Sequence, residues 1–154
     1  MKIIEGGLAS EQVQQMLRQH LLDMAKHSPP GSVHALDVHA LRVPEVSFFS
    51  MWDMDTVAGC AALKALDARN GEVKSMRTAP AYLRRGVVGR LLDKLIKEAC
   101  ERGYHSLWLE TGSAEAFKPA RLFYQRAGFT VCEPFASYTL DPHSVFMTKR
   151  LLKS

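Results

Sequence analysis

The stretch Glu72-Val73-Lys74-Ser75-Met76-Arg77-Thr78-Ala79-Pro80-Ala81-Tyr82-Leu83-Arg84-Arg85-Gly86-Val87-Val88-Gly89 decides the fold of this chain. It predicts a strand over Glu72–Thr78, a short loop that starts at Pro80, and a helix over Gly86–Arg102. Apolar residues at helical spacing give that helix one buried face, and Gly103 marks its end.

A loop that opens a helix in this way is a favourable place for an anion. The first N–H groups of a helix have no partner within it, and the helix dipole adds positive potential there. A glycine such as Gly86 lets a phosphate approach the backbone, and Arg84, Arg85 and Arg90 add full positive charges. The loop has neither the GxxxxGK[ST] nor the GxGxxG spacing, so it is not one of the common nucleotide-binding loops.

Outside this unit, helical and alternating patterns take turns along the chain. We predict strands over Lys2–Glu5, Val46–Trp52, Val57–Leu66, His105–Glu110, Phe129–Glu133 and Ser144–Leu151. We predict helices from Ser10, as N-cap, to the stop Ser28-Pro29-Pro30-Gly31, and from Pro119 to Gly128. This order indicates one mixed α/β domain over residues 1–154, with about seven strands and four helices.

The composition excludes several classes of protein. The 154 residues are 47% hydrophobic and 23% charged, as in ordinary globular proteins. A net charge of +4, with acids and bases interleaved, does not indicate nucleic-acid binding, and no apolar run is long enough for a membrane span. Three widely spaced cysteines without a CxxC pair are read as buried thiols of a cytoplasmic protein, and six histidines without ligand spacing predict no metal site.

Two blocks of the sequence resemble a known family. Leu83-Arg84-Arg85-Gly86-Val87-Val88 aligns with the pyrophosphate loop Q/R-x-x-G-x-G/A of the GNAT superfamily of acetyl-CoA-dependent N-acetyltransferases. The block Ala120-Arg121-Leu122-Phe123-Tyr124-Gln125-Arg126-Ala127-Gly128-Phe129 resembles the family's A-x-x-x-Y-x-x-x-G-F pattern. Together with the order of elements, the resemblance covers nearly the whole chain and is closest to small bacterial acetyltransferases. Leu83, Val88 and Phe117 depart from the family pattern, Phe117 at a position where an Asn often stands.

The resemblance implies a largely antiparallel sheet that splays open at its centre to hold acetyl-CoA. It places the cofactor along the third strand and at the start of the following helix. The residues implied are Met76, Arg77, Thr78, Arg84, Arg85, Gly86, Val87, Val88, Gly89 and Tyr124. It further implies that the Met76 N–H binds the thioester oxygen, that the Tyr124 phenol acts as general acid on the sulfur, and that a homodimer is common.

The base and the acceptor amine are left open by the sequence. Glu72 lies four residues before Met76, which in a regular strand puts both on one face, and Glu110 ends the next strand; either is a candidate base. His34 and His39 are candidates for contact with a small-molecule or peptide amine. The rival hypothesis is a CoA-binding module or sensor without catalysis, because two positions of the loop depart from the family pattern.

Overall fold

The computed structural model describes residues 1–32 and 37–151 of the chain. The strands are β1 (Lys2–Glu5), β2 (Val46–Asp53), β3 (Thr56–Ala65), β4 (Asn70–Thr78), β5 (Ser106–Gly112), β6 (Thr130–Cys132) and β7 (Ser144–Arg150). The α-helices are α1 (Glu11–His27), α2 (Val38–Leu41), α3 (Val87–Glu101) and α4 (Lys118–Arg126), and short 3-10 turns cover Pro30–Ser32, Pro80–Tyr82 and Glu115–Phe117. This mixed, mostly antiparallel architecture confirms the predicted fold class.

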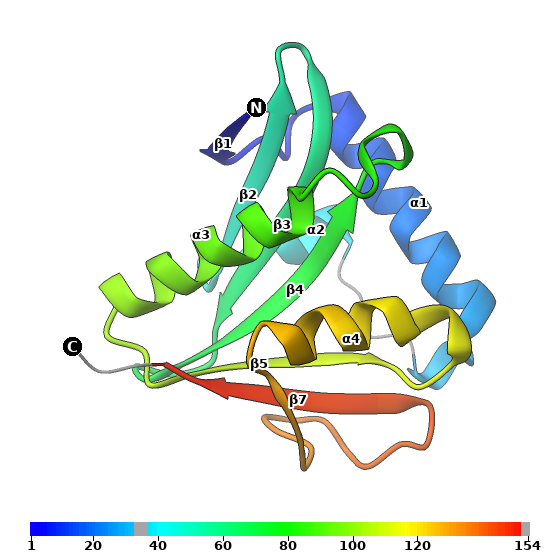
Figure 1. Ribbon diagram of the computed structural model, residues 1–154, viewed down its shortest axis with the longest axis vertical. Helices are drawn as coiled ribbons and strands as arrows, with labels where there is room; N and C mark the ends of the chain where they lie inside the picture. Colours follow the sequence, from blue (N-terminus) through cyan, green and yellow to red (C-terminus); the bar gives the residue numbers. More distant parts are fainter. Residues whose placement is uncertain (33–36, 152–154) are drawn as a thin grey trace.

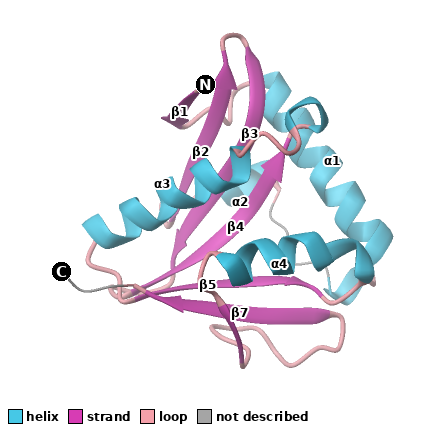
Figure 2. Cartoon of the chain, viewed as in Figure 1, coloured by secondary structure: helices cyan, strands magenta, loops and turns pink. Residues whose placement is uncertain are grey.

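The seven strands form one sheet in the order β1-β2-β3-β4-β5-β7-β6. All neighbouring strands are antiparallel except β4 and β5, which run parallel. Helices cover both faces of the sheet (Figure 2). Buried residues of α3 and α4 pack with one face, and buried residues of α1 and α2 pack with the other. Among the described residues, no helix has the length and apolar character that a membrane crossing requires.

The sheet opens between β4 and β5, as predicted. The two strands pair only where Asn70–Glu72 lie beside Ser106–Trp108. Beyond that point β4 stays with β3 while β5 stays with β7, and the two halves of the sheet diverge (Figure 1). Backbone groups on the facing edges of β4 and β5 are therefore not joined to each other in a ladder, which leaves polar groups for a ligand to meet.

Local sequence signals set the helix ends that matter for this opening. Ser10 caps α1 by accepting a hydrogen bond from the Val13 N–H, and Gly86 begins α3 with a left-handed φ of 77°. Gly128, with φ 98°, ends α4 and lets Phe129 fold back until its ring lies 5.6 Å from that of Tyr124. The cysteines differ from the prediction, because Cys60 alone is buried, Cys132 is half-buried and Cys100 is exposed on α3.

Candidate active site

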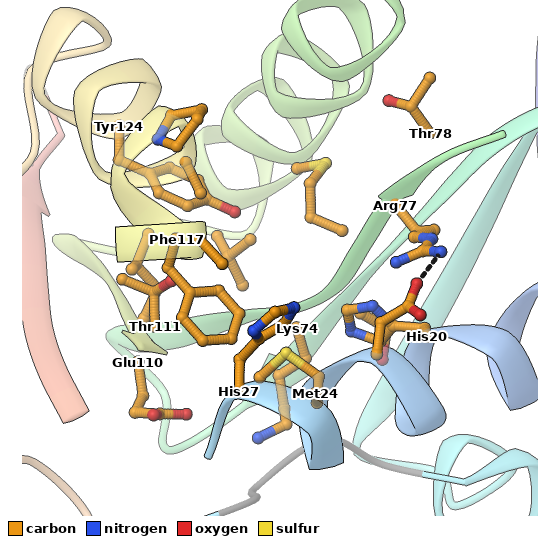
Figure 3. Close-up of a pocket in the computed structure, with 18 of the residues that line it drawn as sticks. His20, Met24, His27, Lys74, Arg77, Thr78, Glu110, Thr111, Phe117 and Tyr124 are labelled. Atoms are coloured by element: carbon orange, nitrogen blue, oxygen red, sulfur yellow. Dashed lines mark hydrogen bonds and ion pairs between the residues drawn. The ribbon is translucent and has the colours of Figure 1, made fainter. Parts of the chain in front are cut away.

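A cavity of about 520 Å³ occupies the gap between β4 and β5. β4 lines it continuously from Glu72 to Thr78, and β5 contributes Leu109, Glu110 and Thr111. Side chains of α1 close one side of the cavity, and the start of α4 with the preceding turn closes another (Figure 3). A cavity of this size, at the place where a sheet splits, is typical of a small-molecule site.

A bulge in β4 shapes the floor of this cavity. The register of β4 against β3 shifts between Cys60 and Ala62, and Ser75 opposite the shift has a φ of 55°. The Ser75 carbonyl accepts a bond from the Cys60 Sγ at 3.3 Å. Because the N–H and C=O of a trans peptide point in opposite directions, the N–H of Met76 points away from Cys60. The bulge therefore frees this amide from the regular alternation of the strand.

The same bulge corrects the prediction that Glu72 and Met76 share one face of the strand. The Met76 side chain packs on the core that includes α3 and α4. The Glu72 side chain instead lies with Lys74 and Tyr138. Even spacing predicts a shared face only in a regular strand, and the extra residue of a bulge reverses the alternation.

Tyr124 lies on α4 with its ring 5.3 Å from that of Phe123 and 5.6 Å from that of Phe129, and it lines the cavity. The residue is 8% exposed, and its hydroxyl points toward the cavity (Figure 3). Burial raises the pKa of the Tyr124 phenol well above its usual range. A phenol in this state keeps its proton at neutral pH, and it is suited to give a hydrogen bond or a proton to a strong base.

The predicted anion-binding loop follows Thr78 along the chain and includes Leu83, and both of these residues line the cavity. The first bond within α3 is from the Arg90 N–H to the Gly86 carbonyl, so the N–H groups of Val87, Val88 and Gly89 come before the helical ladder. Within the described part of the chain, no side chain caps this end of the helix. A Cβ at Gly86 would meet no atom within 4 Å, so the approach to the backbone is open.

The arginines around this loop differ in their contacts. Arg84 is exposed and has a positive φ of 61°, and the Arg85 guanidinium lies 5.0 Å from the centre of the Tyr82 ring. Arg90 donates to the carbonyl of Met1 at 3.2 Å. Arg84 and Arg85 thus stand at the mouth of the loop, where their charge adds to that of the helix dipole.

The candidate base Glu72 is buried in a polar network. Its Oε2 accepts a bond from the Tyr138 hydroxyl at 2.6 Å and pairs with the Lys74 Nζ at 3.1 Å. The Lys74 Nζ also donates to the Tyr138 oxygen at 2.8 Å. Burial and the Glu72 carboxylate, in that order, raise the pKa of Tyr138. The network ties the loop that carries Tyr138 to β4, and the second candidate base, Glu110, lies half-buried on β5 at the cavity wall.

Helix α1 brings to the cavity a set of residues that the sequence analysis did not single out. They share one face of the helix at the spacing i, i+3, i+4 and i+7: His20, Asp23, Met24 and His27. The spacing was the available signal, since polar residues repeating at 3.6 define a face just as apolar ones do.

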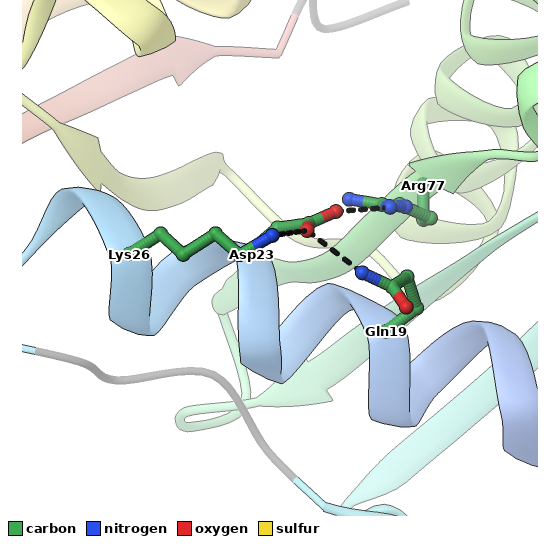
Figure 4. A network of polar contacts seen from close by, with 4 residues as sticks. All are labelled: Gln19, Asp23, Lys26 and Arg77. Carbon is green, nitrogen blue, oxygen red and sulfur yellow. Dashed lines mark hydrogen bonds and ion pairs between the residues drawn. The ribbon is translucent and has the colours of Figure 1, made fainter.

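Asp23 and Arg77 form an ion pair that joins α1 to β4 (Figure 4). The Arg77 hydrogen bond, followed by that from Gln19, lowers the pKa of the Asp23 carboxyl. His20 lies nearby, and its buried Nδ1 has no hydrogen-bond partner among the described residues. Burial, with a smaller effect of the Arg77 charge, lowers the pKa of His20 to about 4. His20 is therefore a neutral imidazole at pH 7.

Neither of the two histidines that were predicted to contact the acceptor is seen at the cavity. His39 is exposed on α2 and does not line the cavity. His34 lies outside the described residues. The histidines that do line the cavity are His20 and His27 of α1.

The sheet thus opens between β4 and β5, and the uncapped start of α3 follows β4 along the chain. Residues 13–129 match the acetyltransferase (GNAT) family, and the chain belongs to that family. It is 53% identical over 151 residues to the uncharacterized N-acetyltransferase YsnE of Bacillus subtilis, covering 98% of this chain and all of that one. It is 48% identical over 142 residues to the uncharacterized N-acetyltransferase YedL of Escherichia coli, covering 92% of this chain and 89% of that one.

A solved structure shows the same fold with a ligand. The crystal structure of an aminoglycoside 6'-N-acetyltransferase complexed with coenzyme A covers all of this chain and 99% of its own, with a TM-score of 0.74. Its sequence is 15% identical, so the likeness concerns the fold. The relatives and the family together confirm that the chain is an N-acyltransferase enzyme.

Proposed function

We propose that this enzyme transfers the acetyl group of acetyl-CoA to a primary amine by direct attack of the amine on the thioester. The single observation that carries the proposal is the cavity between the diverging strands, which Met76 and Tyr124 both line. The uncapped start of α3 is the proposed place for the pyrophosphate, held by the N–H groups of Val87 to Gly89 with charge from Arg84 and Arg85.

The backbone of β4 is proposed to hold the pantetheine arm. Residues Met76 to Thr78 face the gap left by β5, so an extended arm can add to this edge as another strand does. The Met76 N–H, turned by the bulge, then supplies a hydrogen bond to the thioester oxygen as negative charge develops on it. A donor already held in place by the strand needs no reorganisation during the reaction.

The leaving sulfur and the attacking nitrogen need proton transfers in opposite directions. Tyr124 gives its proton to the thiolate as the carbon–sulfur bond breaks, since the phenol is protonated at neutral pH. The attacking nitrogen loses its proton to a group on the acceptor side. Glu72 and Glu110 are both proposed candidates for this role, and the Glu72 Oε2 accepts bonds from Tyr138 and Lys74.

The amine must reach the site as its free base. With a pKa near 10.4, only about one alkylamine in a few thousand is neutral at pH 7, so kcat/KM should rise with pH as the free base increases.

We also retain the cytoplasm as the proposed compartment, since the three cysteines are free thiols.

The experiment that tests this function measures thiol release from acetyl-CoA with a panel of amines, beside calorimetry with coenzyme A. We expect Tyr124→Phe to lower kcat by about 10²- to 10⁴-fold and to leave coenzyme A binding nearly unchanged. Wild-type kcat in the variant would remove Tyr124 from the mechanism. Binding of coenzyme A without turnover of any amine would favour the sensor hypothesis, and no binding would remove both.

A further inference from the structure

Strand β3 contacts β4 at the residue that precedes the Met76 amide. The register between the two strands shifts between Cys60 and Ala62, so that Ala61 alone lies opposite Ser75 and Met76. Two residues against one is the pattern of a β-bulge, in which the ladder between the strands is locally interrupted. The peptide that joins Ser75 to Met76 therefore lies where a regular ladder does not set its orientation.

The backbone of Ser75 has a conformation that its own side chain does not support. Its φ of 55° lies in the left-handed region, which residues with a Cβ disfavour. The Ser75 side chain is buried, and its hydroxyl has no hydrogen-bond partner among the described residues. A contact from another element has to stabilise this part of the bulge.

Cys60 on β3 supplies such a contact. Its Sγ lies 3.3 Å from the Ser75 carbonyl oxygen, to which the thiol donates a hydrogen bond. Cys60 is fully buried, and burial raises the pKa of its thiol to about 12, against a smaller opposing effect of the Arg77 charge. The thiol therefore keeps its proton at neutral pH and remains a donor, which a thiolate cannot be.

The neighbouring Gly59 lets β3 approach a second carbonyl of β4. A Cβ at Gly59 would lie 2.7 Å from the Arg77 carbonyl oxygen. The carbonyls of Ser75 and Arg77, on either side of Met76, thus both lie against β3. Because the peptide bonds are trans, the Met76 N–H points opposite to the Ser75 carbonyl and away from β3.

We propose that Cys60 is a positioning residue for the transfer reaction: its thiol holds the Ser75 carbonyl, and the peptide fixed in this way presents the Met76 N–H to the thioester oxygen. The inference rests on the proposed function, in which that N–H stabilises the negative charge on the oxygen. Cys60 is not among the described residues that line the cavity, so it acts through the backbone of β4. A donor fixed before the reaction needs no ordering during it, so loss of the thiol should lower kcat more than it changes binding.

The first experiment compares the steady-state kinetics of the wild type, Cys60→Ala and Cys60→Ser, with acetyl-CoA and an amine that the wild type acetylates. We expect Cys60→Ala to lower kcat by about three- to tenfold, the range that one net hydrogen bond corresponds to, and to change KM for acetyl-CoA by less than about twofold. Cys60→Ser keeps a donor at the same position and should recover most of kcat. Rates are expressed per site that binds coenzyme A in calorimetry, so that unfolded protein does not count.

Val57→Ala is the matched control for the loss of core packing. Val57 lies on β3, packs in the same core cluster as Cys60, is 6% exposed and does not line the cavity between β4 and β5. Its variant loses buried methyl groups and no donor, so it should lower the urea midpoint and leave kcat per site unchanged. Equal losses of kcat in Val57→Ala and Cys60→Ala would show that Cys60 acts only through the stability of the core, and would overturn the inference.

The second measurement requires no acceptor amine. The NMR resonance of the Met76 amide proton is compared in the complexes with coenzyme A and with acetyl-CoA, because the two ligands differ by the thioester carbonyl. In the wild type we expect acetyl-CoA to move this resonance downfield relative to coenzyme A. The difference should be reduced in Cys60→Ala and restored in Cys60→Ser.

The outcomes separate this inference from the proposed function. A wild-type response of the Met76 amide in Cys60→Ala, or an unchanged kcat, would overturn the role of Cys60 and leave acetyl transfer standing. A folded Cys60→Ser that recovers neither measurement would also overturn it, because the donor would then not be what matters. A wild-type Met76 amide that does not distinguish acetyl-CoA from coenzyme A would overturn the proposed role of Met76, and that of Cys60 with it.

Discussion

Glu72→Gln tests the buried network beside the cavity and needs no knowledge of the acceptor. The side chains of Glu72 and Lys74 are 3% and 8% exposed, so the variant leaves a buried ammonium without its carboxylate. The new amide oxygen still accepts the bond from Tyr138, so the loss comes mainly from the ion pair. Removing one partner of a buried pair costs about 3–5 kcal/mol.

That cost is large enough to measure by thermal unfolding. For a domain of this size, 1 kcal/mol changes Tm by about 2–4 °C, so Glu72→Gln should lower Tm by roughly 6–20 °C. The double variant Glu72→Gln/Lys74→Met removes the stranded charge and keeps an acceptor for Tyr138. Because a buried pair replaced by neutral groups is often close to neutral in stability, the double variant should recover most of the loss.

The assay is thermal unfolding, monitored by circular dichroism, of the wild type, the single variant and the double variant in one buffer. A Tm of Glu72→Gln within 1 °C of the wild type would refute the reasoning, since the ion pair would then contribute nothing. A double variant less stable than Glu72→Gln would also refute it, because the loss would not come from the uncompensated Lys74 charge.

Two more predictions follow from the loop and from α1. Gly86→Ala should lower the free energy of unfolding by about 1–2 kcal/mol in denaturant titrations and weaken coenzyme A binding, because φ is 77° there. Gly89→Ala, inside the first turn and with no described atom within 4 Å of its Cβ, should be neutral or stabilising by up to about 1 kcal/mol. Equal losses of stability in the two variants would contradict this reasoning. His20 has its pKa lowered to about 4, so the unfolded chain takes up a proton below pH 6.5 that the folded chain resists, and stability should fall by up to about 3 kcal/mol from pH 6.5 to 4. His20→Gln should remove that part of the loss in urea titrations at pH 7 and pH 4.5, and an identical pH dependence in the variant would show that His20 is not the group responsible.

The sequence predicts most of the fold because its signals are local. Helix α1 ends before Ser28 and Pro29, α3 begins after Gly86, and α4 ends at Arg126, shortly before Gly128, each as the capping and breaker residues indicate. The succession of alternating and helical patterns gives the strands and their order. The anion-binding start of α3 is also local, since a glycine, a loop and a helix suffice to define it.

The candidate site required the tertiary structure wherever elements distant in sequence meet. Asp23 and Arg77 are 54 residues apart in the sequence, and Glu72 and Tyr138 are 66 residues apart. No local sequence pattern predicts pairs at such separations. The α1 residues that line the cavity share a face by their helical spacing, but that spacing does not show which part of the protein the face meets. The exposed position of His39 likewise depends on how α2 packs.

By itself, the sequence determined the elements, the family and the position of Tyr124, because periodicity, caps and short motifs act over a few residues. The tertiary structure alone decided how far β4 and β5 separate, which way the Met76 amide points and which residues line the cavity. These depend on a bulge set against β3 and on packing between remote elements, and both are fixed only when the chain is folded.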